Sequence, residues 1–72
     1  MKPISTTHRK LGLKIKKLRT KRKITQEDLA FKIGVDRSYM GFIERGERNP
    51  TLKRLMKIAQ ALKVSLSELM EL

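Results

Sequence analysis

The sequence predicts an all-α protein, a compact bundle of five short helices in a single domain. Three observations favour this fold class. Apolar residues recur at helical spacing, no segment alternates apolar and polar residues for long enough to form a strand, and 72 residues leave no room for a second core. The domain is expected over residues 8–72, after a flexible arm over residues 1–7 in which Pro3 disfavours helix.

The first helix is predicted to run from Thr6 or Thr7, either of which can act as its N-cap, to about Lys21 or Arg22. Gly12 is expected to weaken this helix slightly. Two sets of residues follow the helical period, the apolar Leu11, Ile15 and Leu18 and a lysine stripe formed by Lys10, Lys14, Lys17 and Lys21. By default, the lysine stripe is interpreted as a solvated face that adds only long-range attraction.

The second helix is predicted over Gln26–Ile33. Thr25 is its N-cap, in a capping-box pattern in which Asp28 takes the place of the usual glutamate. Gly34 ends this helix, because glycine tolerates the positive φ that commonly follows a helix. Ile24, just before the N-cap Thr25, is expected to face Leu29 in a hydrophobic staple, and it follows Lys23, which is discussed below.

The remaining helices are predicted from the same start and stop signals. Asp36 is the N-cap of a helix over Arg37–Arg45, which Gly46 closes. The fourth helix runs from Leu52 to about Leu62 after the N-cap Thr51, and Leu52 is expected to face the core. The last helix runs from the capping box Ser65-Leu-Ser-Glu68 to the C-terminus.

Composition excludes several function classes. There is no cysteine for disulfides, zinc sites or thiol chemistry, and the single His8 cannot build a metal site or a catalytic triad alone. We therefore expect no catalytic residue, no metal and no cofactor. The sequence has neither a membrane-spanning run nor a secretory signal, so a soluble cytoplasmic protein is expected. The net charge of +11 indicates a polyanionic partner.

The segment around residues 26–45 has the geometry of a helix-turn-helix. Ala30 lies four residues before Gly34, where a small side chain lets the next helix cross closely. Gly34 permits the tight turn, and Val35 places an apolar side chain beneath it. In such a motif the second helix is free to enter the major groove of DNA.

Residues from about 9 to 70 resemble the Cro and lambda-repressor-like (XRE-type) family of helix-turn-helix DNA-binding domains. The resemblance rests on Leu11-Gly-Leu-Lys-Ile-Lys-Lys-Leu-Arg, Ile24-Thr-Gln-Glu-Asp-Leu-Ala, Ile43-Glu-Arg-Gly-Glu-Arg-Asn-Pro-Thr-Leu and Leu62-Lys-Val-Ser-Leu-Ser-Glu-Leu. Asp36-Arg-Ser-Tyr-Met and Arg48-Asn49 are similar to controller proteins of bacterial restriction–modification systems. Related phage repressors share much of these sequence motifs, so the controller proteins and the phage repressors both remain open as the subgroup. Lys23 departs from the family, which often has glycine there, and either the turn differs or Lys23 is left-handed.

Four residues are predicted to face the bases, because Met40 and Ile43 point inward from the third helix. Arg37 can bond guanine bidentately, or it can pair with Asp36 or be solvated. Tyr39 either contacts DNA or packs at the edge of the core, and Phe42 either touches thymine methyl groups or is covered by neighbours. The predicted base contacts are Arg37, Ser38, Tyr39 and Phe42.

A second set of residues is predicted to contact the sugar–phosphate backbone. Helix N-termini favour phosphates, and the family resemblance assigns this contact to Gln26. The predicted backbone contacts are Thr25, Gln26, Arg45, Arg48, Asn49, Thr51 and Lys53.

Three further roles are predicted outside the DNA contacts. The resemblance implies a structural ion pair between Arg19 and Glu44. It also implies that Glu27 contacts the sigma subunit of RNA polymerase, although the acid can simply complement the helix dipole. Dimerisation is expected because the last third of the chain carries more apolar residues than a small core can bury. The predicted interface residues are Met56, Leu62, Leu66, Leu69 and Met70.

The sequence thus predicts a bacterial or phage-encoded transcriptional regulator that binds a near-palindromic operator in double-stranded DNA as a homodimer. It would repress and could also activate, in a restriction–modification system, a phage or a toxin–antitoxin locus. No small-molecule ligand is implied. Two rivals remain: an RNA-binding basic protein, which would lack aromatic residues for stacking, and a membrane-surface protein, because the first helix is basic and amphipathic.

Overall fold

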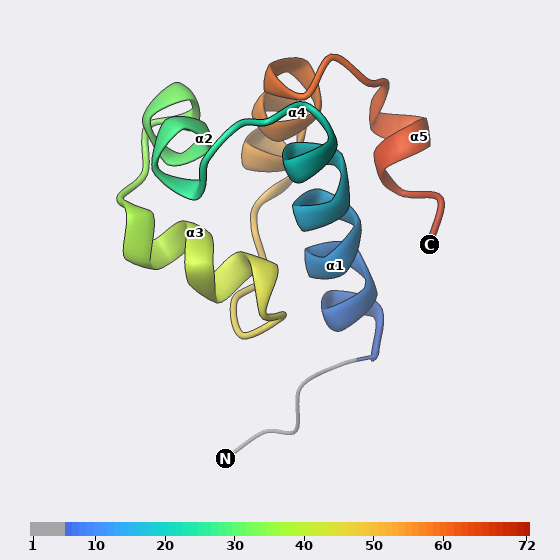
Figure 1. Ribbon diagram of the computed structural model, residues 1–72. Coiled ribbons are helices and arrows are strands. Elements are labelled where there is room, and N and C mark those ends of the chain that lie inside the picture. The colour runs from blue at the N-terminus through green and yellow to red at the C-terminus, as the bar shows by residue number, and fades with distance from the viewer. Residues whose placement is uncertain (1–5) are drawn as a thin grey trace.

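The computed structural model describes residues 6–72, and the regular secondary structure of this part of the chain consists of helices, without strands (Figure 1). The five predicted helices are all present, which confirms the all-α fold class. None of the described helices is long and apolar enough to cross a membrane. The helices are α1 (Thr6–Lys21), α2 (Gln26–Ile33), α3 (Arg37–Glu44), α4 (Leu52–Ala61) and α5 (Leu66–Leu69).

Two boundaries differ from the prediction by more than one residue, and α3 ends at Glu44 instead of Arg45. Thr6 and Thr7 belong to α1, so the predicted arm over residues 1–7 is too long, and its residues 1–5 lie outside the described part of the chain. The last helix is a single turn that ends at Leu69 instead of continuing to the C-terminus. Leu69 is fully buried, whereas the three residues after it are exposed, so no further apolar face is available to hold a longer helix on the core.

Four helices begin at the predicted capping residues. In each case the side-chain oxygen accepts a hydrogen bond from the backbone N–H three residues later, which contributes about 1 kcal/mol per cap. The donor–acceptor distances are 3.0 Å for Thr25, 2.7 Å for Asp36, 3.2 Å for Thr51 and 2.9 Å for Ser65. Lys23 adopts a left-handed conformation, with φ 59°, the second of the two alternatives for this turn.

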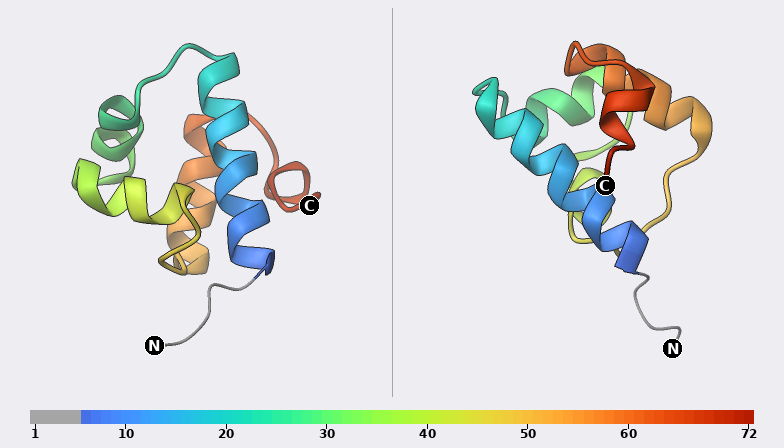
Figure 2. Two further views of the ribbon diagram at one scale, coloured as in Figure 1. Left: turned by 60° about the horizontal axis from the view of Figure 1, so that its bottom comes forward. Right: turned by 90° about the vertical axis from the view of Figure 1, so that its right-hand side faces the viewer.

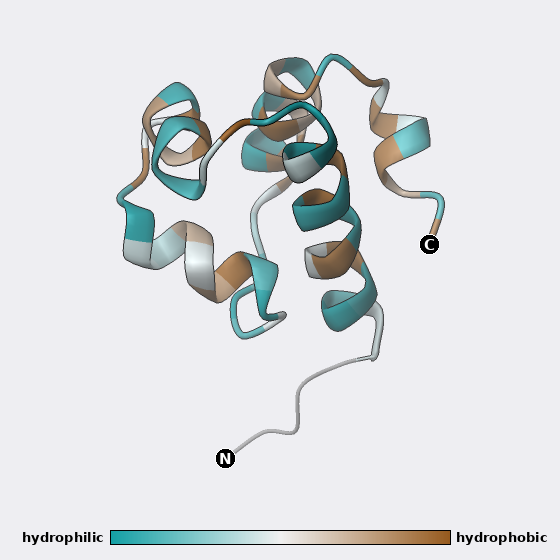
Figure 3. Cartoon of the chain, in the orientation of Figure 1, coloured by the Kyte–Doolittle hydropathy of each residue, from teal (hydrophilic) through white to brown (hydrophobic). Residues whose placement is uncertain are grey.

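The core lies where α1, α2, α3 and α4 meet, and α1 stands between α3 and α5 (Figures 1 and 2). Hydrophilic and hydrophobic residues both occur within the turns of α1, as expected for a helix with one apolar side (Figure 3). Leu52 was predicted to face this core, but 63% of its surface is exposed. The buried apolar residues are Leu11, Ile15, Leu29, Ala30, Ile33, Met40, Ile43, Leu55, Ile58, Ala59, Leu62 and Leu69.

Gly12 marks the closest approach of α1 to α3. A Cβ atom at this position would overlap the backbone carbonyl oxygens of Ile43 and Glu44 at the end of α3. The weakening of α1 that glycine causes is therefore offset by a contact that no larger residue permits. This contact sets the position of α3 relative to the rest of the bundle.

Candidate nucleic-acid interface

α2 and α3 form the helix-turn-helix that the sequence predicts. Gly34 has φ 76°, and its left-handed conformation turns the chain directly after α2. Val35 packs partly buried against the core, and Ala30 is buried where the two helices cross. α3 lies along the lower left edge of the molecule in Figure 1, so the side opposite Met40 and Ile43 faces outward.

The outward side of α3 borders a hollow of about 280 Å³. Arg37 and Ser38 line it from the first turn of α3, and both are exposed. Asp36 uses its carboxylate to cap α3, and within residues 6–72 it forms no ion pair with Arg37. The guanidinium of Arg37 is therefore available to a ligand. The hollow is lined by Gln26, Arg37, Ser38, Gly41, Phe42 and Arg45.

Phe42 lies between two arginines. The guanidinium carbons of Arg45 and Arg48 are 5.1 Å and 5.6 Å from the centre of its ring, within the range of cation–π contacts. The ring is 37% exposed, so it is partly covered and still reaches the surface. Arg45 also donates a hydrogen bond to Glu47 over 2.9 Å. Phe42 thus holds two cations beside the hollow.

Tyr39 packs at the edge of the core, one of the two alternatives for it. Its ring is partly buried, and the guanidinium of Arg54 lies 4.8 Å from the ring centre. The same guanidinium donates a hydrogen bond to the tyrosine hydroxyl oxygen over 3.2 Å. This contact leaves the hydroxyl hydrogen free to be donated to a ligand. Arg54 is a residue that the sequence reasoning missed.

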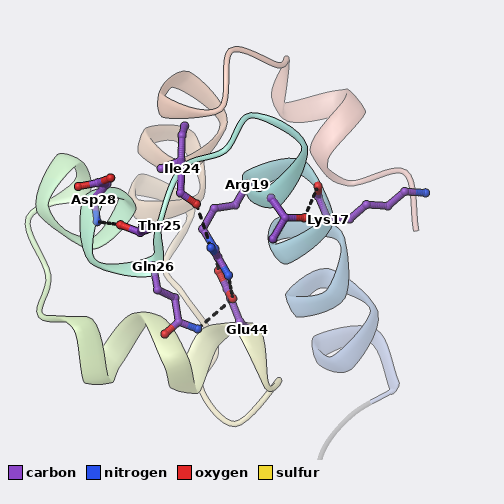
Figure 4. A network of polar contacts seen from close by, with 8 residues as sticks. Lys17, Arg19, Ile24, Thr25, Gln26, Asp28 and Glu44 are labelled. Carbon is purple, nitrogen blue, oxygen red and sulfur yellow. Dashed lines mark hydrogen bonds and ion pairs between the residues drawn. The ribbon is translucent and has the colours of Figure 1, made fainter.

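A buried network joins α1, α2 and α3 behind the hollow (Figure 4). Arg19 donates to both carboxylate oxygens of Glu44, over 2.6 Å and 3.0 Å, so the expected ion pair is present. Arg19 also donates to the carbonyl oxygen of Ile24 over 2.9 Å. Gln26 donates from Nε2 to Glu44 over 3.0 Å. Both members of the ion pair are buried, at 9% and 4% exposure.

This network orients Gln26 at the first position of α2. One N–H of its side-chain amide is used by Glu44, which leaves a second N–H for another acceptor. The backbone N–H groups of the first helical turn also lack partners within the helix, apart from the one that Thr25 caps. The end of α2 beside the hollow therefore presents hydrogen-bond donors.

A second hollow, of about 350 Å³, lies between the turn of the helix-turn-helix and the start of α4. Thr51 and Lys53 line it, together with Gly34, Arg54 and Lys57. Arg48 and Asn49 are exposed in the loop before α4. No carboxylate lines either this hollow or the one at α3. Four of the seven predicted backbone-contacting residues, Gln26, Arg45, Thr51 and Lys53, thus line the two cationic hollows.

The predicted dimer residues fall into two groups. Leu62 and Leu69 are fully buried in the core of this chain, so their assignment to a subunit interface is wrong. Met56 and Met70 are 56% and 40% exposed, and Leu66 is partly buried. Leu52, one turn before Met56 on α4, adds a further exposed apolar side chain.

One exposed aromatic residue was also missed. Phe31 is 86% exposed on the outer side of α2, outside the stripe formed by Leu29, Ala30 and Ile33. Glu27 and Asp28, one turn earlier, are exposed as well. The position of Phe31 outside the inward-facing stripe of α2 is the sequence signal that could have identified it as exposed.

Comparison with known proteins agrees with this geometry. A family model described as helix-turn-helix matches residues 15–69. The chain belongs to this helix-turn-helix family. It is 46% identical over 61 residues to the control protein C.MunI of Mycoplasma sp, a match that covers 83% of this chain and 82% of that protein. It is 39% identical over 61 residues to the control protein C.BamHI of Bacillus amyloliquefaciens, covering 83% and 75%.

The same family includes solved structures with this arrangement of helices. The restriction-modification controller protein C.AhdI of Aeromonas hydrophila superposes with a TM-score of 0.87 at 43% identity, covering 90% of this chain and 98% of that one. The chain also matches the immunity repressor protein of Bacillus phage phi105, with 44% identity over 57 residues but only 40% of that protein covered. Members of this helix-turn-helix family thus include both subgroups that the sequence motifs suggest.

Proposed function

We propose that the chain is a transcriptional regulator that binds a near-palindromic operator in double-stranded DNA as a homodimer. The observation that carries the proposal is a pair of cationic hollows, one beside α3 and one between the turn and the start of α4, neither of which is lined by a carboxylate. Phosphates on both sides of a major groove would find cations and N–H donors there, while α3 enters the groove. The control proteins among its relatives favour regulation of restriction–modification genes in a bacterial cytoplasm.

The residues divide between reading bases and holding the backbone. Arg37 and Ser38, at the start of α3, are positioned for base edges, and Phe42 for a thymine methyl group. Tyr39 is held toward α4 by Arg54, which favours a phosphate contact through its hydroxyl hydrogen over a base contact. The backbone contacts are assigned to Thr25, Gln26, Arg45, Arg48, Asn49, Thr51 and Lys53.

Selection of bound sequences from random duplexes, followed by competition, tests the main proposal. We expect a two-fold symmetric sequence with half-sites one helical turn apart to be bound much more tightly than random duplex. Structured RNA and vesicles of anionic lipid serve as competitors for the two rival functions. Preferential binding of either competitor, or the absence of any enriched sequence, would contradict the proposal.

Dimerisation is proposed through the exposed Leu52 and Met56 of α4, the partly buried Leu66 of α5 and the exposed Met70 that follows it. Sedimentation of the wild type at high micromolar concentration should show a dimer. Met56→Glu should shift it toward monomer and weaken operator binding, because a carboxylate would be buried at the interface. A wild-type monomer both with and without DNA would contradict this interface.

Activation is a second proposed function, which Phe31 favours. An aromatic ring that is 86% exposed beside Glu27 and Asp28 offers an apolar and acidic surface on an otherwise cationic protein. Such a surface suits contact with a basic part of the polymerase sigma subunit. Transcription should fall in Glu27→Gln and in Phe31→Ser while operator affinity stays unchanged. Equal activation by wild type and both variants would leave Glu27 as a helix-start residue only.

A further inference from the structure

The lysine stripe of α1 is a cationic surface that the proposed contacts do not use. Lys10, Lys17 and Lys21 are exposed and Lys14 is partly so, and none of them forms an ion pair within residues 6–72. At about 100° per residue they fall within a narrow sector of the helix. No acidic residue occurs in the first 26 positions of the chain. A solvated helix face usually alternates charges at this spacing, because like charges one turn apart destabilise a helix.

The stripe points away from the helix-turn-helix. Gly12 and Arg19 contact the end of α3, and at about 100° per residue they lie roughly opposite the lysines around α1. Figures 1 and 2 show α1 standing between α3 and α5, which places the stripe on the α5 side. A straight duplex held against α3 therefore cannot reach these lysines.

Carboxylates near the stripe do not neutralise it. Glu71 lies beside Lys10, Lys14 and Lys17 in one groove, and Glu68 lies beside Lys21 in another. Arg22 and Lys63 line the second groove and add two further cations. The cations of this surface therefore outnumber its acids, and α1 has none of its own.

We propose that the lysine stripe binds a second segment of double-stranded DNA, so that a regulator bound to its operator can bridge to another duplex. This inference rests on the proposed function. From Lys10 to Lys21 the stripe is about 16 Å long, along which one DNA strand carries roughly five phosphates. A membrane surface would need a broad inserted apolar face, but Leu11 and Ile15 of α1 are buried in the core and Leu13 is the one largely exposed apolar side chain of this helix. A duplex carrying an operator also supplies further DNA at high local concentration.

A two-duplex capture assay tests the proposal. Operator duplex is immobilised and saturated with protein, and a labelled duplex of random sequence is then added; capture is normalised to the protein bound. Wild type should capture the second duplex, and raising salt from 50 to 200 mM should reduce capture by roughly 10²-fold if four phosphates are neutralised. The variant Lys10→Gln, Lys14→Gln, Lys17→Gln, Lys21→Gln should lose at least tenfold in capture with operator affinity nearly unchanged.

A matched control separates the stripe from net charge. Replacing Arg9, Lys16, Lys23 and Lys32 by glutamine removes the same charge from exposed positions outside the stripe and outside both hollows, and this control should keep its capture. Melting temperatures should show both variants folded. Equal losses in both variants, no capture by wild type, or stronger competition by anionic vesicles or structured RNA than by duplex would overturn the proposal.

If the proposed function is wrong, the protein will not bind the immobilised operator duplex in the first step of the assay, and this result is distinct from a loss of capture. In that case anisotropy with random duplex still tests the stripe. The stripe variant should then show a salt dependence that is shallower than that of the control variant, and equal slopes would overturn the proposal.

Discussion

Replacing Arg19 by alanine should remove a large part of the stability of this domain. Arg19 and Glu44 are 9% and 4% exposed, and Arg19 donates three hydrogen bonds, two to Glu44 and one to the Ile24 carbonyl. The variant would leave a buried carboxylate whose one remaining partner in the network is the Gln26 amide. Breaking one side of a buried pair costs about 3–5 kcal/mol. A domain of this length has about 4–11 kcal/mol of total stability.

The assay is thermal and urea denaturation followed by circular dichroism. Arg19→Ala should lower Tm by at least about 12 °C, at about 4–8 °C per kcal/mol for a domain of this size. Glu47→Gln is the control, because it breaks the exposed pair with Arg45, which contributes less than about 1 kcal/mol. The double variant Arg19→Met, Glu44→Leu should recover part of the loss, since no charge stays buried. A cost for Arg19→Ala no larger than that of the control would refute the reasoning.

Three further predictions concern binding and packing. Arg37→Ala should cost about 1–3 kcal/mol per half-site and relax preference at one base position, whereas Arg48→Ala should weaken all sequences evenly, as measured by selection and anisotropy. Operator affinity should fall with salt by about 0.9 log units per tenfold salt for each phosphate contacted, and a slope near zero would contradict the backbone contacts. Gly12→Ala should destabilise the fold by about 1–3 kcal/mol or more in a thermal melt despite the better helix propensity of alanine, and a more stable variant would show that α1 and α3 can separate freely.

The helices and the helix-turn-helix could be predicted because their signals are local. A capping hydroxyl or carboxylate such as that of Thr25 or Asp36 bonds the N–H three residues later, whatever the rest of the chain does. Gly34 likewise terminates α2 through its own φ. The lysine stripe and the net positive charge can also be predicted from the sequence, because helical spacing alone brings the lysines to one face of the helix.

Tertiary contacts decided which residues are accessible. Leu62 and Leu69 are apolar like Leu52 and Met56, and only the packing of α4 and α5 on the other helices buries the first two and exposes the others. The placement of Tyr39 under Arg54, and of Phe42 between Arg45 and Arg48, depends on residues from separate segments.

The sequence by itself determined five helices, four of them with their N-caps, their order and a strong positive charge, because capping and helical period act within a few residues. The tertiary structure decided how close α1 comes to α3, where only glycine fits at Gly12. It also decided that the hollow beside α3 and the hollow between the turn and α4 are lined by cations without carboxylates, while the lysine stripe faces the other way. These properties depend on distances between helices, which are set by the packing of side chains far apart in the chain.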